Sequence, residues 1–122
     1  MNNITIIGNV GQDPELKYLP SGQCSLTFSV ATSRKVKEEW QTTWHKVVVW
    51  GDMAENCAAS ISKGNRVIVM GRIDVREWSN KGGEKRTTTE IVADEVAASF
   101  KKATAVVTRL VSETAGDNNE SF

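Results

Sequence analysis

Residues 42–61 read TTWHKVVVWGDMAENCAASI, a pattern that predicts a strand followed directly by a helix. In an extended strand, successive side chains lie on opposite faces, so residues of even number share one face. That face carries Trp44, Lys46, Val48 and Trp50. A strand that packs against a core normally hides its large aromatic side chains and exposes its charges. A lysine between two tryptophans on one face suits a polyanion with flat bases, which indicates binding of single-stranded nucleic acid.

The second half of the same stretch predicts a helix over residues 52–61. Asp52 is placed to act as the N-cap, and Glu55 follows three residues later, as in a capping box. Lys63 and Gly64 then supply a basic last turn and a glycine of the kind that ends helices.

Elsewhere the hydrophobic period is close to two, which indicates strands. They are expected at residues 4–10, 24–30, 43–51, 66–78 and 87–96, with the polar segment 33–42 as a hairpin connection. In the second of these strands the alternation places Cys24, Leu26, Phe28 and Val30 on the inward face. Five strands with a helix between the third and the fourth are the arrangement of the OB-fold, a small Greek-key barrel. We therefore expect an all-β protein with one helix. Residues 1–111 would form this domain and residues 112–122 a short flexible tail.

The overall charge neither favours nor excludes a nucleic-acid partner. The 122 residues include 15 Lys and Arg against 15 Asp and Glu, so the formal net charge is zero. Any electrostatic attraction must therefore come from a local patch of cations.

Cysteine and histidine usage argues against a metal site. Cys24 and Cys57 are isolated in the sequence and His45 is the only histidine, too few ligands for a zinc or iron–sulfur centre. We expect two buried thiols, no metal and no cofactor. The sequence carries neither a phosphate-binding loop nor the pattern of a catalytic triad, so we expect no enzyme. It also carries no apolar run long enough to span a membrane, and we expect a cytoplasmic protein.

Seven short segments follow one another at characteristic spacings between residues 3 and 100. They are IIGNVGQDPEL at 6–16, PSG at 20–22, WHKVVVWG at 44–51, AEN at 54–56, KG at 63–64, VMGR at 69–72 and KRTTTE at 85–90. In this order the chain resembles the bacterial single-stranded DNA-binding proteins, and DEV at 94–96 with SFKKATAVV at 99–107 is similar to their actinobacterial branch. The resemblance implies sequence-independent coating of single-stranded DNA during replication, recombination or repair, in association with the nucleoid.

The resemblance implies specific roles for the tryptophans. Trp44, Trp50 and Trp78 match the three positions at which the family stacks aromatic side chains on bases. Trp40 differs, because relatives place their extra aromatic residue nearer to the position of Val36. A stacking role for Trp40 is therefore left open, as is simple surface packing.

Cations are expected beside these aromatic residues. Lys46 is the best candidate for a phosphate contact, and Arg72 and Arg76 share the strand parity of Trp78. Further candidates, which could equally be solvated surface residues, are Arg34, Lys35, Lys63, Lys85 and Arg86. Acidic residues stand where relatives often carry Lys or Arg, namely Asp52, Asp74 and Glu77. We therefore expect a shallower salt dependence of binding than in more basic relatives.

The resemblance also implies self-association. Family members are homotetramers, built as a dimer of dimers, and pairing through the strand at residues 4–10 would place Ile4 and Ile6 at the contact. His45 faces away from the tryptophans and is expected near a subunit interface. Residues 103–111 alternate apolar side chains and could add an extra C-terminal strand that clamps a neighbouring subunit.

The C-terminal residues depart from the family pattern. A long Gly/Pro/Gln-rich linker with an acidic tip recruits enzymes in major family members, whereas the sequence here reads GDNNESF at 116–122. Tail-mediated recruitment is therefore doubtful, and the chain resembles a short paralogue or a phage or plasmid version. Because one fold hosts many functions, the alternative is an RNA-binding or primosome-type protein-interaction module on the same barrel.

Overall fold

The computed structural model describes residues 2–111, so the predicted tail at residues 112–122 lies outside the described residues. Within this part the chain forms six strands and one helix. In chain order they are β1 (Ile4–Val10), β2 (Glu15–Tyr18), β3 (Cys24–Val36), β4 (Glu39–Trp50), α1 (Asp52–Ser60), β5 (Arg66–Ser79) and β6 (Lys85–Ala98).

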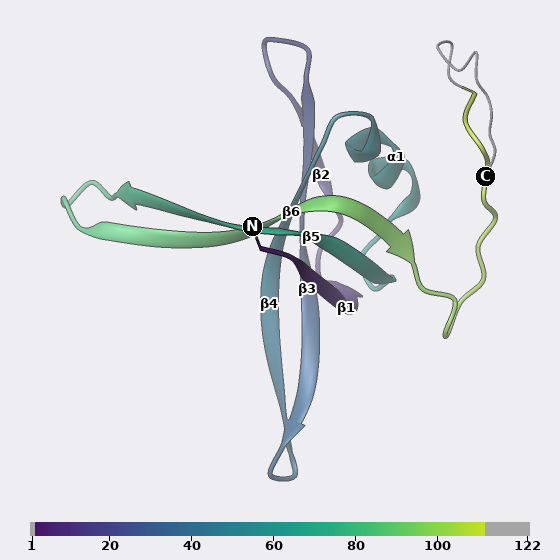
Figure 1. Cartoon of the computed structure of the whole chain (residues 1–122), viewed down its shortest axis with the longest axis horizontal. Helices are drawn as coiled ribbons and strands as arrows, with labels where there is room; N and C mark the ends of the chain where they lie inside the picture. The colour runs from purple at the N-terminus through teal and green to yellow at the C-terminus, as the bar shows by residue number, and fades with distance from the viewer. Residues whose placement is uncertain (1, 112–122) are drawn as a thin grey trace.

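The strands form a closed barrel. Their order in the sheet is β1-β5-β6-β4-β3-β2, and an additional pairing of β1 with β3 joins the two ends of the five-stranded barrel. The β4–β6 pair is parallel, while β1–β3, β1–β5, β2–β3, β3–β4 and β5–β6 are antiparallel. With α1 between the β3–β4 and β5–β6 hairpins (Figure 1), this is the predicted OB-fold, which is confirmed.

The barrel interior is filled by alternate side chains of its strands. The predicted inward face of β3 is confirmed, since Cys24, Leu26, Phe28 and Val30 are all buried. Val47 and Val49 of β4 and Val67 and Val69 of β5 are fully buried beside them. The helix α1 adds Ala54 and Cys57 to the same core. Burial raises the pKa of the Cys57 thiol to about 11, so this thiol stays protonated at neutral pH.

Two long hairpins extend beyond the barrel as arms that point in different directions (Figure 1). The β3–β4 arm stays paired as far as Val36 and Glu39, and its two-residue turn holds Lys37 and Glu38 at φ values of 49° and 71°. The β5–β6 arm stays paired as far as Ser79 and Lys85. The polar segment 33–42, predicted as a connection, is therefore mostly strand. Its side chains show no period because neither face of the arm meets the core.

Strand β2 was not predicted, because its four residues follow a proline and give too short a pattern. It pairs with β3 between Glu15–Thr27 and Tyr18–Cys24. The Tyr18 hydroxyl donates a hydrogen bond to Glu55 Oε2 at 3.1 Å, which raises the pKa of Tyr18 and ties β2 to α1.

The prediction for the helix ends was partly wrong. Gly51, with φ 73°, is the N-cap residue and makes no side-chain capping bond, while Asp52 is already helical. Its carboxylate and that of Glu55 still lie in the first turn, where the helix dipole favours negative charge. The helix ends at Ser60 without a basic last turn, and Gly64, at φ 90°, belongs to the following loop.

Residues 103–111, expected to add a strand, form no strand in this single chain. They run away from the barrel after β6 (Figure 1), and Val106 and Val111 are each 94% exposed. A clamp on a neighbouring subunit therefore remains a prediction.

The core arrangement predicts a large cost for truncating Leu26, which is fully buried between β3 and its neighbours. We expect Leu26→Ala to lower the free energy of unfolding by about 2–5 kcal/mol, since it removes buried methyl groups and leaves a cavity. Urea unfolding at fixed protein concentration measures this. The matched control is Leu19→Ala, because Leu19 is 40% exposed. Equal losses in the two variants would contradict the assigned core.

Candidate nucleic-acid interface

The even-numbered face of β4 points out of the barrel, as its sequence predicted. Trp44 and Trp50 are 62% and 37% exposed, and Lys46 lies exposed between them. Val48 on the same face is buried, which the alternation did not anticipate. The residues opposite on β3 are small: Ala31 pairs with Trp44, Ser29 with Lys46 and Ser25 with Trp50. Small neighbours leave the flat faces of the indoles accessible.

Trp44 rests on Gly11, at the end of β1. A Cβ atom at Gly11 would come within 2.3 Å of the Trp44 ring, so only glycine allows this approach. A shallow hollow of about 290 Å³ opens beside the ring, lined by Gly11, Gln12, Ser29 and Trp44. A second hollow of about 240 Å³ shares Gln12 and Ser29 with it, and is also lined by Asp13, Glu15, Thr27, Phe28 and Lys46.

The third predicted tryptophan lies on the β5–β6 arm. Trp78 is 49% exposed, and its indole Nε1–H donates a hydrogen bond to Thr88 Oγ1 of β6 at 2.9 Å. The bond fixes the edge of the ring and leaves a face open. Arg72, Arg76 and Trp78 have the same parity on β5, and all three are exposed, as predicted.

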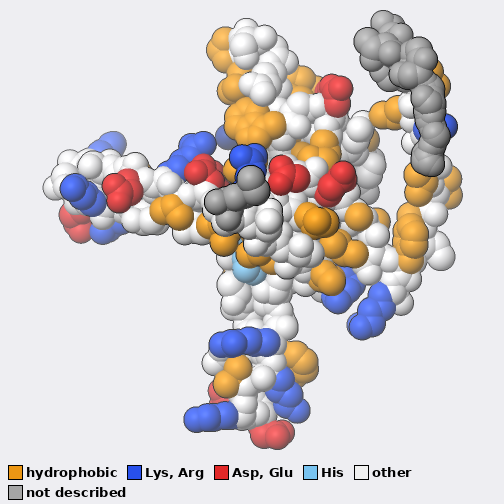
Figure 2. All heavy atoms as spheres, in the orientation of Figure 1, with side chains coloured by type: hydrophobic (Ala, Val, Ile, Leu, Met, Phe, Trp, Pro, Cys, Tyr) orange, Lys and Arg blue, Asp and Glu red, His pale blue; other side chains and the backbone are white. Residues whose placement is uncertain are grey.

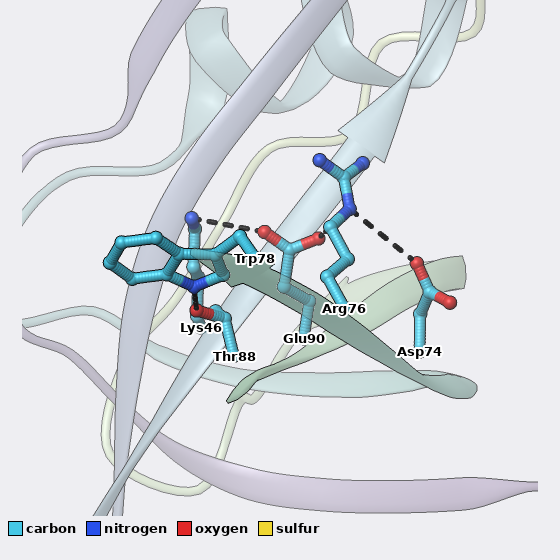
Figure 3. A network of polar contacts seen from close by, with 6 residues as sticks. All are labelled: Lys46, Asp74, Arg76, Trp78, Thr88 and Glu90. Carbon is cyan, nitrogen blue, oxygen red and sulfur yellow. Dashed lines mark hydrogen bonds and ion pairs between the residues drawn. The ribbon is translucent and has the colours of Figure 1, made fainter. Parts of the chain in front are cut away.

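A network of ion pairs and hydrogen bonds connects β4 and β5, the strands that carry the tryptophans, through β6 (Figure 3). Its centre is Glu90 of β6, which is only 5% exposed. Glu90 Oε2 lies 3.0 Å from Lys46 Nζ, and Glu90 Oε1 lies 3.5 Å from Arg76 Nε. Arg76 Nε is also 3.8 Å from Asp74 Oδ2. Two of the predicted phosphate-binding cations are therefore already paired with carboxylates.

Glu90 and Thr88 are the two residues of this polar network that the sequence did not reveal. The alternation in residues 87–91 places both on the outer face, opposite the buried Ile91. The contact with Lys46, however, depends on the parallel pairing of β4 with β6, in which Lys46 stands opposite Glu90. No local pattern specifies that pairing.

Half of the other predicted cations are also close to acids. Arg72 Nε lies 3.7 Å from Asp94, Arg86 Nη2 lies 3.1 Å from Glu84, and Lys35 Nζ lies 3.6 Å from Glu38. Among the described residues, no ion pair involves Arg34, Lys63 or Lys85. Figure 2 shows cations and acids side by side on the β5–β6 arm, whereas the β3–β4 arm is mostly basic with its acids near the turn.

The remaining predicted residues are dispersed. Trp40 has the parity of Trp44 and is 69% exposed near the turn of the β3–β4 arm. Lys63 lies in the loop after α1, where its backbone N–H donates to Asp13 Oδ1. His45 is half-buried on the opposite face of β4, with Nε2 2.9 Å from Thr32 Oγ1.

Of the two interface isoleucines, Ile4 is half-buried and Ile6 belongs to the barrel core. Ile6 therefore cannot offer its side chain to a neighbouring subunit without unpacking the core. The large apolar side chain that β1 exposes is Ile7.

Within residues 2–111, no group of three or more His, Cys, Asp or Glu side chains is placed to hold a metal ion. The same residues include no helix long and apolar enough to cross a membrane.

The chain is an OB-fold barrel whose two hairpins carry exposed tryptophans and cations. These features are typical of the small barrels that bind nucleic-acid strands. Comparison with known proteins narrows this class. Residues 1–99 match the family described as the single-strand binding protein family, and the chain belongs to that family.

Curated relatives and a solved structure agree with this assignment. The chain is similar to the single-stranded DNA-binding protein of Paenarthrobacter aurescens, at 42% identity over 113 residues, covering 87% of this chain and 66% of the relative. It is also similar to that of Mycolicibacterium smegmatis, at 37% identity, covering 87% and 68%. The chain thus spans about two thirds of the length of these actinobacterial relatives. A structure described as the Plasmodium falciparum SSB complex with ssDNA superposes with a TM-score of 0.75 at 29% identity, covering 80% of this chain and 94% of that one.

The buried carboxylate of Glu90 predicts a stability role for Lys46. We expect Lys46→Met to lower the free energy of unfolding by about 1–2 kcal/mol, because it leaves a buried carboxylate with only the more distant Arg76. Adding Glu90→Gln should recover part of the loss, which urea unfolding of the single and double variants measures as a coupling. Lys17→Met is the matched control, since both members of the Lys17–Glu15 pair are well exposed. Strict additivity would rule out the coupling.

Proposed function

We propose that this chain binds single-stranded DNA without sequence preference and without catalysis, as part of replication, recombination or repair in the cytoplasm. The observation that carries the proposal is the placement of Trp44, Trp50 and Trp78, which are exposed on β4 and β5, the two strands that flank β6 in the sheet. Every base has a flat face, so stacking on such side chains tolerates any sequence, at about 1–3 kcal/mol per base. The family membership and the ssDNA complex of the Plasmodium falciparum relative support the same ligand.

In this proposal residues 1–111 are the binding domain, in which the tryptophans stack on bases and nearby cations contact phosphates. Trp44 and Trp50 would receive bases on the barrel, and Trp78 would receive one on the β5–β6 arm. Phosphate contacts would come from the cations around them: Lys46, Arg72, Arg76 and Arg86, with Arg34, Lys35 and Lys63 farther away. Trp40 shares the correct face and is proposed as an extension of the stacking surface along the β3–β4 arm.

Substitution of the tryptophans tests this directly. We expect Trp44→Ala, Trp50→Ala and Trp78→Ala each to weaken binding to labelled oligo-dT by about 5- to 150-fold, the equivalent of one lost stacking contact. Trp78→Phe should lose less, because it keeps an aromatic face. Fluorescence anisotropy titrations give the affinities, and circular dichroism verifies that each variant is folded.

The same titration with oligo-rU separates this function from its alternative. Strong binding to oligo-dT with quenching of tryptophan fluorescence would support the proposal. Weak binding to DNA together with tight binding to RNA would instead favour the RNA-binding module, and alanine variants that bind DNA as tightly as the parent would exclude the stacking surface.

We further propose that the chain assembles as a homotetramer, a dimer of dimers that wraps one DNA strand over several barrels. The first strand supports this. β1 pairs with β5 from Ile4 to Asn9, but with β3 only at Asn9 and Val10. Its second edge from Ile4 to Ile7 therefore pairs with no strand among residues 2–111, and an unpaired edge can accept a strand of another copy.

Light scattering coupled to size exclusion tests the assembly. At micromolar concentration we expect four times the 13.4 kDa chain mass. Thr5→Pro should reduce that mass, because proline removes a backbone donor and is poorly tolerated within a paired strand. Since Thr5 also pairs with Met70 of β5, circular dichroism must show that the barrel of this variant is intact. Asn3→Pro, just outside β1, is its control. A monomeric parent chain at this concentration would refute the tetramer.

A further inference from the structure

We infer that Glu90 is an internal counter-charge that competes with DNA phosphate for Lys46 and Arg76, and so limits the electrostatic part of binding. The inference rests on the proposed function, since it concerns the same surface. Glu90 would touch no DNA itself; it would act through the two cations that it pairs with.

The pairing geometry engages both oxygens of the carboxylate. Oε2 meets Lys46 of β4 at 3.0 Å, and Oε1 meets Arg76 of β5 at 3.5 Å, so one carboxylate bridges cations from two strands (Figure 3). Arg76 is shared with a second acid, Asp74, at 3.8 Å. The two cations and two acids of this cluster have a formal charge of zero.

Burial makes the competition unequal. The Glu90 side chain is 6% exposed, whereas those of Lys46 and Arg76 are 49% and 63% exposed. The cation heads can turn toward a phosphate, but the carboxylate has little access to water that would replace them. A phosphate that draws a cation away therefore leaves a buried carboxylate with fewer partners, which is unfavourable. A phosphate that shares the cation instead lies within a short distance of the Glu90 charge, which repels it.

Stacking of bases on the tryptophans is not weakened in this way, because it involves no charge that Glu90 could compensate. Glu90 thus lowers the phosphate contribution while leaving the aromatic contribution unchanged. Binding becomes more dependent on exposed base faces, which single strands offer and duplexes do not.

The experiment compares Glu90→Gln with the parent chain in titrations of labelled oligo-dT at several salt concentrations. Glutamine keeps the shape of the side chain and can still accept a hydrogen bond from Lys46, so the fold should be retained. We expect binding to tighten about three- to tenfold at low salt. The slope of log K against log salt should steepen by about 0.7 for each additional phosphate neutralised.

The matched control is Glu95→Gln, which makes the same charge change at an exposed position of β6 opposite Met70. It should alter neither quantity appreciably. In a Lys46→Gln/Arg76→Gln background, Glu90→Gln should lose its effect, because the paired cations are gone. Circular dichroism of each variant verifies the fold.

Several outcomes would overturn the inference. Glu90→Gln could bind more weakly or leave the salt slope unchanged, which would mean that Glu90 helps to hold the cations in place for DNA. If Glu90→Gln tightened binding equally in the Lys46→Gln/Arg76→Gln background, the Glu90 charge would be repelling DNA directly and not through the two cations. Failure of the parent chain to bind oligo-dT would be a different result, because it would refute the proposed function itself.

Discussion

The parallel pairing of β4 with β6 is the constraint on which the rest of the molecule depends. It covers only Lys46–Glu90, Val47–Ile91 and Val48–Val92, yet it joins the two halves of the barrel. Val47 and Ile91 meet in the core through it, and Lys46 and Glu90 meet on the outer face. One short register therefore decides both how the barrel closes and which charges are neutralised beside the tryptophans. A shift by one residue would exchange the two faces.

The sequence predicted the features that depend on local alternation. The buried face of β3 and the outward parity of Trp44 and Trp50 follow from periodicity, and the position of α1 follows from the residue types near its ends; the structure confirms all three. What could not be predicted depends on distant partners or on segments without a period. Glu90 became visible only through its register with Lys46, and the arms are longer than expected because polar strands pair without a core. Asp52 was taken for the N-cap because its residue type fits, whereas the positive φ of Gly51 sets the start of the helix.

Because several cations of this surface are paired with acids, we expect the aromatic side chains to contribute a larger share of the binding free energy. Lys46, Arg72, Arg76, Arg86 and Lys35 all have a carboxylate within 4 Å, so the cations nearest to Trp44 and Trp78 are largely compensated. The acidic residues Asp52, Asp74 and Glu77, unusual beside the family pattern, belong to different settings: a helix start, the Arg76 pair and an exposed position of β5. Only Asp74 enters the Glu90 network.

The two arms differ from the barrel in what holds them together. Beyond the core their strands bury little apolar surface, and an isolated two-stranded hairpin is marginally stable in water. They should therefore open locally at a lower free energy than the barrel, with faster exchange of their amide protons. Trp50 stands opposite Ser25 at the barrel end of β4, whereas Trp78 stands opposite Arg86 near the end of an arm. Trp50 therefore lies on the rigid barrel, whereas we expect Trp78 to move with its arm, so the separation between these two aromatic side chains is expected to vary.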